Sequence, residues 1–126
     1  MCLYNQQREL TLIAIIFEVE PAKDEQENYL KLAQQMKAHL EQMDGFISVE
    51  RFQSLATPGK LLSLSFWRDE ESVERWRSLE AHRRAQKKGR EELFANYRLR
   101  VAHVLRDYGM EHRAQAPDDS KKVHGG

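Results

Sequence analysis

Residues 10–19 constrain the fold more than any other stretch, because they are apolar on both faces of an extended strand. Side chains on a strand alternate between its two faces. Here the two faces carry Leu10, Leu12, Ala14 and Ile16 on one side and Ile13, Ile15 and Phe17 on the other. A strand of this kind must be covered on both sides. Helices can cover one face of its sheet, so the sequence requires a further layer over the second face.

The composition excludes several classes of protein. The chain has 126 residues, which fits one domain. Its 20 basic and 20 acidic side chains balance, so no overall field draws it to nucleic acid or to an anionic membrane. The apolar run is shorter than the roughly 20 residues that span a bilayer. Cys2 is the single cysteine and has no partner for an internal disulfide. We therefore expect a soluble, cytoplasmic protein with no nucleic-acid and no membrane partner.

The rest of the chain predicts two helices and three further strands. Pro21 ends the first strand, and Asp24 is expected to cap a helix whose apolar residues recur at steps of three and four. Asp69 is expected to cap a second helix, with a break or kink at Gly89. The further strands are predicted at 46–55, Leu61–Trp67 and 97–105, with a turn at 57–60 joining the first two of them.

The element order β-α-β-β-α-β predicts an α+β, ferredoxin-like fold with a four-stranded antiparallel sheet. The apolar first and third strands belong at its centre. The charged second strand and the fourth strand belong at its edges, and both helices pack on one face. Burying each large aliphatic side chain gains roughly 1.5–3 kcal/mol, so we expect a second copy to cover the other face and form a dimeric α/β barrel. The predicted domain spans 10–109, between a flexible arm at 1–9 and a polar tail at 110–126.

Three segments of the chain carry a resemblance to a known family. They are the strand end and acidic helix start FWRDEESVERW, the segment AHRRAQ with Gly89-Arg90, and the closing strand YRLRVAHVLRDYG. Over about residues 10–109 the chain resembles the antibiotic biosynthesis monooxygenase (ABM) superfamily of small dimeric α/β-barrel proteins. The match looks strongest to small uncharacterised bacterial members. The family includes cofactor-independent oxygenases of phenolic polyketides, quinol oxygenases and haem-degrading enzymes.

Single residues distinguish the family's activities, and this chain matches them only in part. In the polyketide type, catalysis is linked to an asparagine, a tryptophan and an arginine; Trp67 matches the tryptophan, but strand Leu61–Trp67 has only Ser63 and Ser65 as polar members. In the haem-degrading type, a tryptophan is followed ten residues later by a histidine that binds iron. Trp76 matches that tryptophan, but Gln86 stands where the histidine should be. Haem degradation is therefore disfavoured.

Two catalytic and three substrate-binding residues are predicted. His82 is the candidate base, because an imidazole with a pKa near ~6.5 can take a phenolic proton. Trp67 is predicted to act beside it in catalysis, and Trp76, Arg90 and Phe94 are predicted to bind the substrate. Each has a plainer interpretation: both tryptophans are expected in a core whatever the function, a buried histidine can be structural, and most of the basic helix surface must face water.

The leading functional hypothesis is a cofactor-independent monooxygenase that uses molecular oxygen on a small electron-rich aromatic molecule of the phenol or quinol type. It needs no metal, and no pair of histidines has the spacing of a zinc site. The alternative is a non-catalytic ligand-binding or stress-related dimer that keeps the fold without the chemistry. The missing asparagine motivates this alternative.

Overall fold

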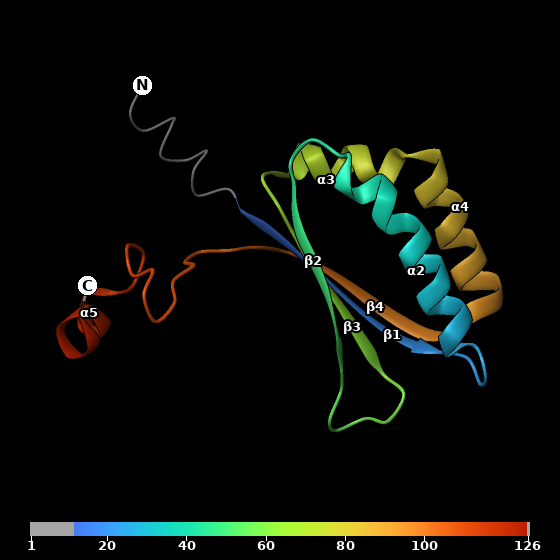
Figure 1. The fold of residues 1–126 in the computed structure, drawn as a ribbon, viewed down its shortest axis with the longest axis horizontal. Coiled ribbons are helices and arrows are strands. Elements are labelled where there is room, and N and C mark those ends of the chain that lie inside the picture. Colours follow the sequence, from blue (N-terminus) through green and yellow to red (C-terminus); the bar gives the residue numbers. More distant parts are fainter. Residues whose placement is uncertain (1–11, 126) are drawn as a thin grey trace.

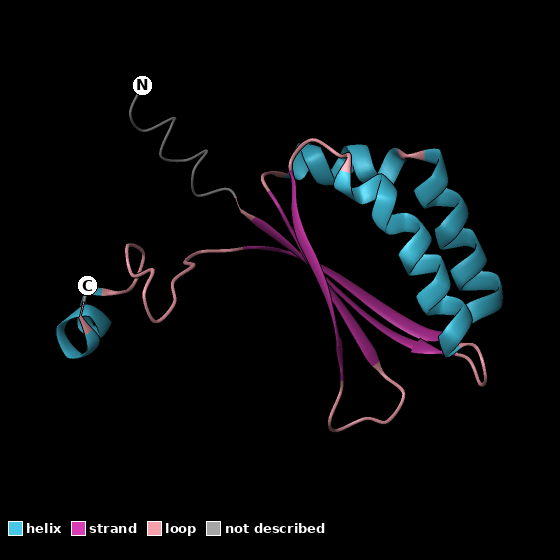
Figure 2. Cartoon of the chain, in the orientation of Figure 1, coloured by secondary structure: helices cyan, strands magenta, loops and turns pink. Residues whose placement is uncertain are grey.

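The computed structural model describes residues 12–125, and in this part of the chain four antiparallel strands form one sheet, with helices covering one of its faces (Figure 1 and Figure 2). The elements in chain order are β1 (Ile13–Pro21), α2 (Gln26–Glu41), β2 (Phe46–Gln53), β3 (Leu61–Trp67), α3 (Glu70–Ser78), α4 (Glu80–Lys88), η1 (Gly89–Leu93), β4 (Phe94–His103) and α5 (Asp118–His124). The predicted N-terminal arm, Cys2 and the first residues of the predicted first strand lie outside the described part of the chain.

The strand order is β2-β3-β1-β4, so the prediction that the first and third strands are central is confirmed. Strand β1 pairs antiparallel with both β3 and β4, and Ile15 lies opposite Ser65 on one side and Val101 on the other. Within the described residues, the charged strand β2 pairs with β3 alone and forms an edge of the sheet. The chain therefore has the α+β, ferredoxin-like architecture that its apolar pattern predicts.

The helix-covered face of the sheet carries two separate hydrophobic clusters. One cluster contains Trp67 with Ile13, Leu40, Val73 and Trp76, and the other contains Leu61 with Val19 and Tyr29. Trp67 and Leu61 are the two ends of β3, and their side chains point to the same face because strand residues alternate. Between them, on that same face, β3 presents only Ser63 and Ser65. The two clusters are thus separated by a stretch of small side chains.

The second helix starts as the sequence predicts. The carboxylate of Asp69 accepts hydrogen bonds from the Ser72 backbone N–H at 2.8 Å and from the Ser72 hydroxyl at 2.6 Å. This cap satisfies a donor that the first helical turn leaves free. Gly45, with φ of 91°, passes directly over Ser72, and a Cβ there would overlap the Ser72 hydroxyl. The end of β3, the cap and the turn before β2 are therefore held together at one corner.

The predicted cap of the first helix is wrong. Helix α2 begins at Gln26 with Glu25 as the preceding residue, and Glu25 makes no side-chain cap. Asp24 instead has φ of 66°, in the left-handed region, within a turn closed by a bond from Glu25 N–H to the Ala22 carbonyl at 2.9 Å. Asparagine and aspartate tolerate this conformation better than most residues. The turn after Pro21 takes one more residue than expected and moves Asp24 out of the cap position.

The second helical segment is broken at a position that the sequence does not mark. Helix α3 ends at Ser78, Leu79 is extended with ψ of 131°, and α4 begins at Glu80. The break or kink predicted at Gly89 takes the form of a change in helix type: α4 ends at Lys88, the backbone of Gly89 stays helical, and a five-residue π-turn leads into β4. The Phe94 ring fills the place of a side chain at Gly89. Strand β4 consequently begins at Phe94, earlier than predicted.

The opposite face of the sheet carries no helix among the described residues (Figure 2). Alternation places Ile16, Leu62, Leu64 and Phe66 on this outer face, and Phe52 on the edge strand is 42% exposed there. Near one end of this face, Glu18 forms ion pairs with Lys60 at 3.6 Å and with Arg100 at 3.4 Å. The face is thus a band of aliphatic and aromatic side chains bordered by charge.

The segment after β4 leads away from the sheet and ends in helix α5 (Figure 1). Arg113 holds it together, because its guanidinium donates to the carbonyls of Gly109 and Gly125 and to the Ser120 hydroxyl, the last at 2.7 Å. The polar stretch predicted as a tail therefore contains local structure. In residues 12–125, no helix is long and apolar enough to cross a membrane.

Candidate functional site

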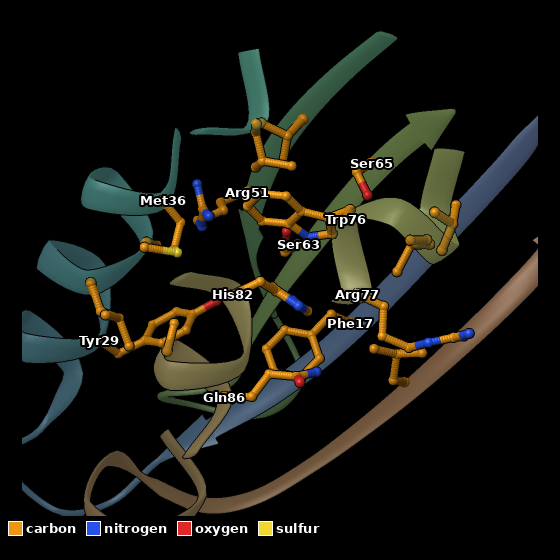
Figure 3. Close-up of a pocket in the computed structure, with 18 of the residues that line it drawn as sticks. Phe17, Tyr29, Met36, Arg51, Ser63, Ser65, Trp76, Arg77, His82 and Gln86 are labelled. Carbon is orange, nitrogen blue, oxygen red and sulfur yellow. The ribbon is translucent and has the colours of Figure 1, made fainter. Parts of the chain in front are cut away.

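A cavity of about 210 Å³ lies between the helices and the sheet, in the space between the two hydrophobic clusters (Figure 3). Ser63 and Ser65 of β3 contribute to its floor together with Ile15 and Phe17 of β1, while helices α2, α3 and α4 supply the opposite wall. Most of the lining is apolar. The volume lies below the roughly 300–1,000 Å³ of common ligand pockets. The cavity therefore suits a small organic molecule better than a polycyclic one.

Trp76 and His82 meet across the helix break and form one wall of the cavity. Their ring centroids lie 4.7 Å apart at an interplanar angle of 41°. In an unbroken α-helix, residues six apart point about 120° away from each other around the axis. The extended Leu79 redirects the chain between α3 and α4, so the two rings face each other. The break is therefore what brings the candidate base onto the tryptophan.

The half-buried side chain of His82 is favoured in its neutral form. Burial lowers its pKa from the ordinary value, and the main-chain carbonyl of Arg77 opposes this effect to a smaller extent. Its Nδ1 atom is buried and has no hydrogen-bond partner in the part of the chain that the structure describes. A neutral imidazole has a nitrogen lone pair that can accept a proton. This side chain can therefore act as a base toward a molecule in the cavity.

Arg51 also lines the cavity, although the sequence analysis assigned it no role there. The residue lies on β2 opposite Ser63, and its Nε atom is buried without a hydrogen-bond partner among the described residues. Beside it, burial raises the pKa of the Tyr29 hydroxyl, and the Arg51 guanidinium partly offsets that rise. The edge position of its strand was predicted correctly. The available signal was alternation, because Arg51 is two residues from the inward-facing Val49.

The structure brings together three of the five predicted site residues. His82, Trp76 and Phe94 line the cavity. Trp67 does not line it: the side chain is fully buried in the core, its indole N–H donates to the Ser65 hydroxyl at 3.0 Å, and its ring lies 6.3 Å from that of Trp76. Arg90 is exposed on the π-turn and lies outside the lining.

The cavity opens toward strand β4. Leu99 and Val101 of that strand line it and are 46% and 48% exposed, respectively. Arg77 and Gln86 line it from α3 and α4 and are exposed as well. These four residues define the mouth. A ligand entering there passes His82 before it reaches Arg51 on the far edge strand.

The chemistry available in this cavity is that of a base, a cation and aromatic walls. Within residues 12–125, no three side chains of His, Cys, Asp or Glu lie close enough together to hold a metal ion. The site can accept a proton at His82, stack a planar ring against Trp76, and stabilise negative charge at Arg51. These are the groups that a proton abstraction from an acidic hydroxyl would use.

The one-sided helical layer and the four-stranded sheet define an α+β ferredoxin-like domain, with an apolar cavity between the two layers that opens toward β4. The family model described as "Antibiotic biosynthesis monooxygenase" matches residues 12–88. The chain therefore belongs to the ABM family, as its sequence motifs indicated.

Individual relatives agree with this assignment. A protein of Pyricularia oryzae named "Jasmonate monooxygenase ABM" is 45% identical over 93 residues, which are 74% of this chain and 43% of that relative. An uncharacterised Bacillus subtilis protein, YqjZ, is 28% identical over 93 residues, covering 74% of this chain and 79% of its own. The fungal relative is the more similar of the two, so the expected closeness to bacterial members is not confirmed.

Solved structures show the same fold. SnoaB, a cofactor-independent oxygenase from Streptomyces nogalater, has a TM-score of 0.68 to this chain at 8% identity. The match covers 77% of this chain and 96% of SnoaB. At this identity the likeness concerns the fold alone.

The lowered pKa of His82 predicts a specific pH dependence of stability. Between the ordinary imidazole pKa of about 6.5 and the lower native value, the unfolded chain binds a proton that the native protein does not. The free energy of unfolding should therefore fall as the pH drops below about 6.5. The variant His82→Gln lacks this contribution, so its urea-unfolding midpoint should fall less between pH 7.5 and 5.5 than that of the wild type.

The matched control for this measurement is His39→Gln, which removes an exposed imidazole from α2. It reports the effect of losing a histidine as such. Equal pH dependence in the wild type and in His82→Gln would contradict the assignment of a buried, neutral His82.

Proposed function

We propose that the protein is a cofactor-independent monooxygenase that oxidises a small electron-rich aromatic molecule, of the phenol or quinol type, with molecular oxygen. The observation that carries the proposal is the half-buried imidazole of His82, whose pKa is lowered by burial and whose ring packs on Trp76 at the wall of a small apolar cavity. Membership of the ABM family supports it. So does the name of one similar protein, a jasmonate monooxygenase, of which the chain spans less than half.

The proposed reaction begins with proton transfer. His82 takes the proton of an aromatic hydroxyl, and the resulting phenolate is a far better electron donor than the phenol. The phenolate passes an electron to molecular oxygen, and the carbon and oxygen radicals combine to form the new C–O bond. In the hydroxyl form of an anthrone, the ring carbon that reacts carries one hydrogen. The peroxide formed there takes back the proton from His82 and then loses water together with that carbon's hydrogen, so that one oxygen atom becomes the carbonyl and the other leaves as water. The substrate supplies all the electrons, so the balance requires no external reductant.

The other side chains hold the substrate for this step. Trp76 stacks on the ring, and Phe94, whose ring centroid lies 5.8 Å from that of Phe17, closes the opposite side. Trp67 supports Trp76 from the core and acts as a positioning residue. Arg90 is exposed beyond the lining, and the proposal gives it no contact with the substrate. Most of the remaining wall is apolar, which limits the access of water to the phenolate.

A non-catalytic ligand-binding or stress-related module is the second candidate. One observation favours it: the polar side chains on β3 are Ser63 and Ser65, and the Ser65 hydroxyl is engaged by the Trp67 indole. No asparagine lies on the floor of the cavity in the described chain. The same cavity would then bind an aromatic molecule without transforming it.

Oxygen uptake with a panel of hydroquinones and anthrones tests the catalytic proposal. We expect turnover by the wild type and a loss of about 100-fold or more in kcat for His82→Gln, the scale of losing a general base. Trp76→Leu should chiefly raise KM, because it removes a stacking surface. His39→Gln is the control and should leave turnover unchanged.

Two outcomes would reject this mechanism. Turnover that is insensitive to His82→Gln contradicts the role of the base. Tight binding of these aromatics by the wild type with no oxygen consumption at any pH supports the non-catalytic candidate instead.

The proposed working unit is a homodimer in which two sheets pack through their outer faces. Ile16, Leu62, Leu64 and Phe66 would form the buried centre of this interface. Sheets packed face to face lie about 10 Å apart, with side chains from both inner faces interdigitating. A second copy of the same chain is enough to bury these apolar side chains, and no other protein is needed.

Light scattering coupled to size exclusion tests the dimer. The wild type should elute with twice the chain mass of 14.8 kDa. Leu64→Glu places a charge at the centre of the proposed interface and should shift the protein to a monomer, whereas Leu55→Glu, at a fully exposed leucine in the hairpin loop, should not. A wild-type monomer at micromolar concentration, or a dimer unaffected by Leu64→Glu, would contradict the proposal.

A further inference from the structure

We propose that the cavity is built for an aromatic carboxylic acid, with Arg51 as the residue that binds the carboxylate. This inference rests on the proposed function only in taking the cavity as a small-molecule site, and it names the substrate class. The carboxylate would lie against β2 at the far side of the cavity from the mouth. The ring would lie between Arg51 and the mouth, beside Trp76 and His82 (Figure 3).

Unsatisfied polar atoms point to this cavity and to no other place in the described chain. Among residues 12–125, two buried side-chain polar atoms lack a hydrogen-bond partner: Arg51 Nε and His82 Nδ1. Both residues line the same cavity. Buried polar groups are almost always hydrogen-bonded, so each exception needs an explanation. One ligand that offers a polar atom at each end explains both.

The chemistry of Arg51 determines which kind of polar atom the ligand must present to it. The Nε atom of arginine only donates, so a ligand must bring an acceptor. The side chain is always charged, and its half-buried position gives it the Tyr29 hydroxyl as a partner but no counter-charge. No aspartate or glutamate of the described chain forms an ion pair with Arg51. An anionic ligand would supply the missing partner.

The charges around the cavity agree with an anion. Its described lining contains the cations Arg51 and Arg77 and no acidic residue. Arg77 stands at the mouth and Arg51 on the opposite edge strand, so an approaching anion is favoured from entry to final position. The nearby Tyr29 hydroxyl stays protonated because burial raises its pKa, and it remains a hydrogen-bond donor.

The shape of the site favours a carboxylate over a larger anion. A guanidinium matches a carboxylate with two parallel hydrogen bonds. A single arginine beside one tyrosine supplies few donors for a doubly charged phosphate group, and the cavity of about 210 Å³ leaves little room beyond one substituted ring. The carboxylate also orients the ring, because it can reach Arg51 only when the rest of the molecule lies toward His82.

Binding measured without turnover tests this inference separately from the proposed reaction. The probes are benzoate, phenylacetate and 2,5-dihydroxybenzoate, each paired with its methyl ester and titrated by anaerobic calorimetry. At least one acid should bind about tenfold or more tightly than its ester, as expected for a charged hydrogen-bonded contact. Arg51→Met should abolish that preference while ester binding persists, and Arg51→Lys should retain part of it. Arg84→Gln, an exposed arginine of α4, is the matched control and should bind as the wild type does.

Three results would overturn the inference. The wild type could bind every acid and its ester with equal affinity, or bind no acid at millimolar concentration. Alternatively, both Arg51 variants could be folded and lose acid and ester binding equally. The outcomes also separate the two proposals. A preference for acids without oxygen uptake rejects the monooxygenase and supports the acid site. Turnover that depends on His82 but is equally fast for acids and their esters supports the monooxygenase and rejects the acid site.

Discussion

Two serines on the central strand β3 are the feature on which the site depends. Protein interiors are normally close-packed. Large side chains in the middle of β3 would fill the space between the sheet and the helices and leave no cavity. Here Leu61 and Trp67 anchor a hydrophobic cluster at each end of the strand, and Ser63 and Ser65 lie between them. The helices are held at the distance set by the large end residues. The space above the serines is the cavity.

The second determinant is the break at Leu79, because it decides which groups face that cavity. It turns α4 so that His82 packs on Trp76, and the resulting burial lowers the pKa of the imidazole, which favours its neutral form. From the opposite edge of the sheet, β2 contributes Arg51. A proton acceptor and a fixed cation thus stand on different walls of one apolar space. A molecule with an acidic hydroxyl and a carboxylate would match both, which is how the proposed reaction and the proposed substrate class fit together.

The sequence predicted the architecture well because the signals for it are local or periodic. Residues apolar on both faces placed β1 at the centre, and Asp69 was recognisable as a cap from its position before an acidic first turn. The features that the sequence did not predict depend on tertiary contacts. Nothing in the residues around Leu79 marks a break, since neither glycine nor proline occurs there. The charge of Arg51 indicated an edge strand correctly but did not reveal its inward direction. Trp67 was expected at the site, but it lies in the core, where its indole N–H donates a hydrogen bond to the Ser65 hydroxyl.

Filling the cavity tests whether the space above Ser63 is where an aromatic ligand binds. Ser63→Leu adds an aliphatic side chain to the cavity floor, whereas Ser63→Ala leaves the space open; neither disturbs the bond between Ser65 and Trp67. The measurement is the affinity for aromatic ligands by calorimetry, with urea unfolding as the check on folding. We expect Ser63→Leu to stay folded and to lose ligand affinity by at least tenfold, while Ser63→Ala should bind as the wild type does. Undiminished ligand binding by a folded Ser63→Leu variant would contradict it.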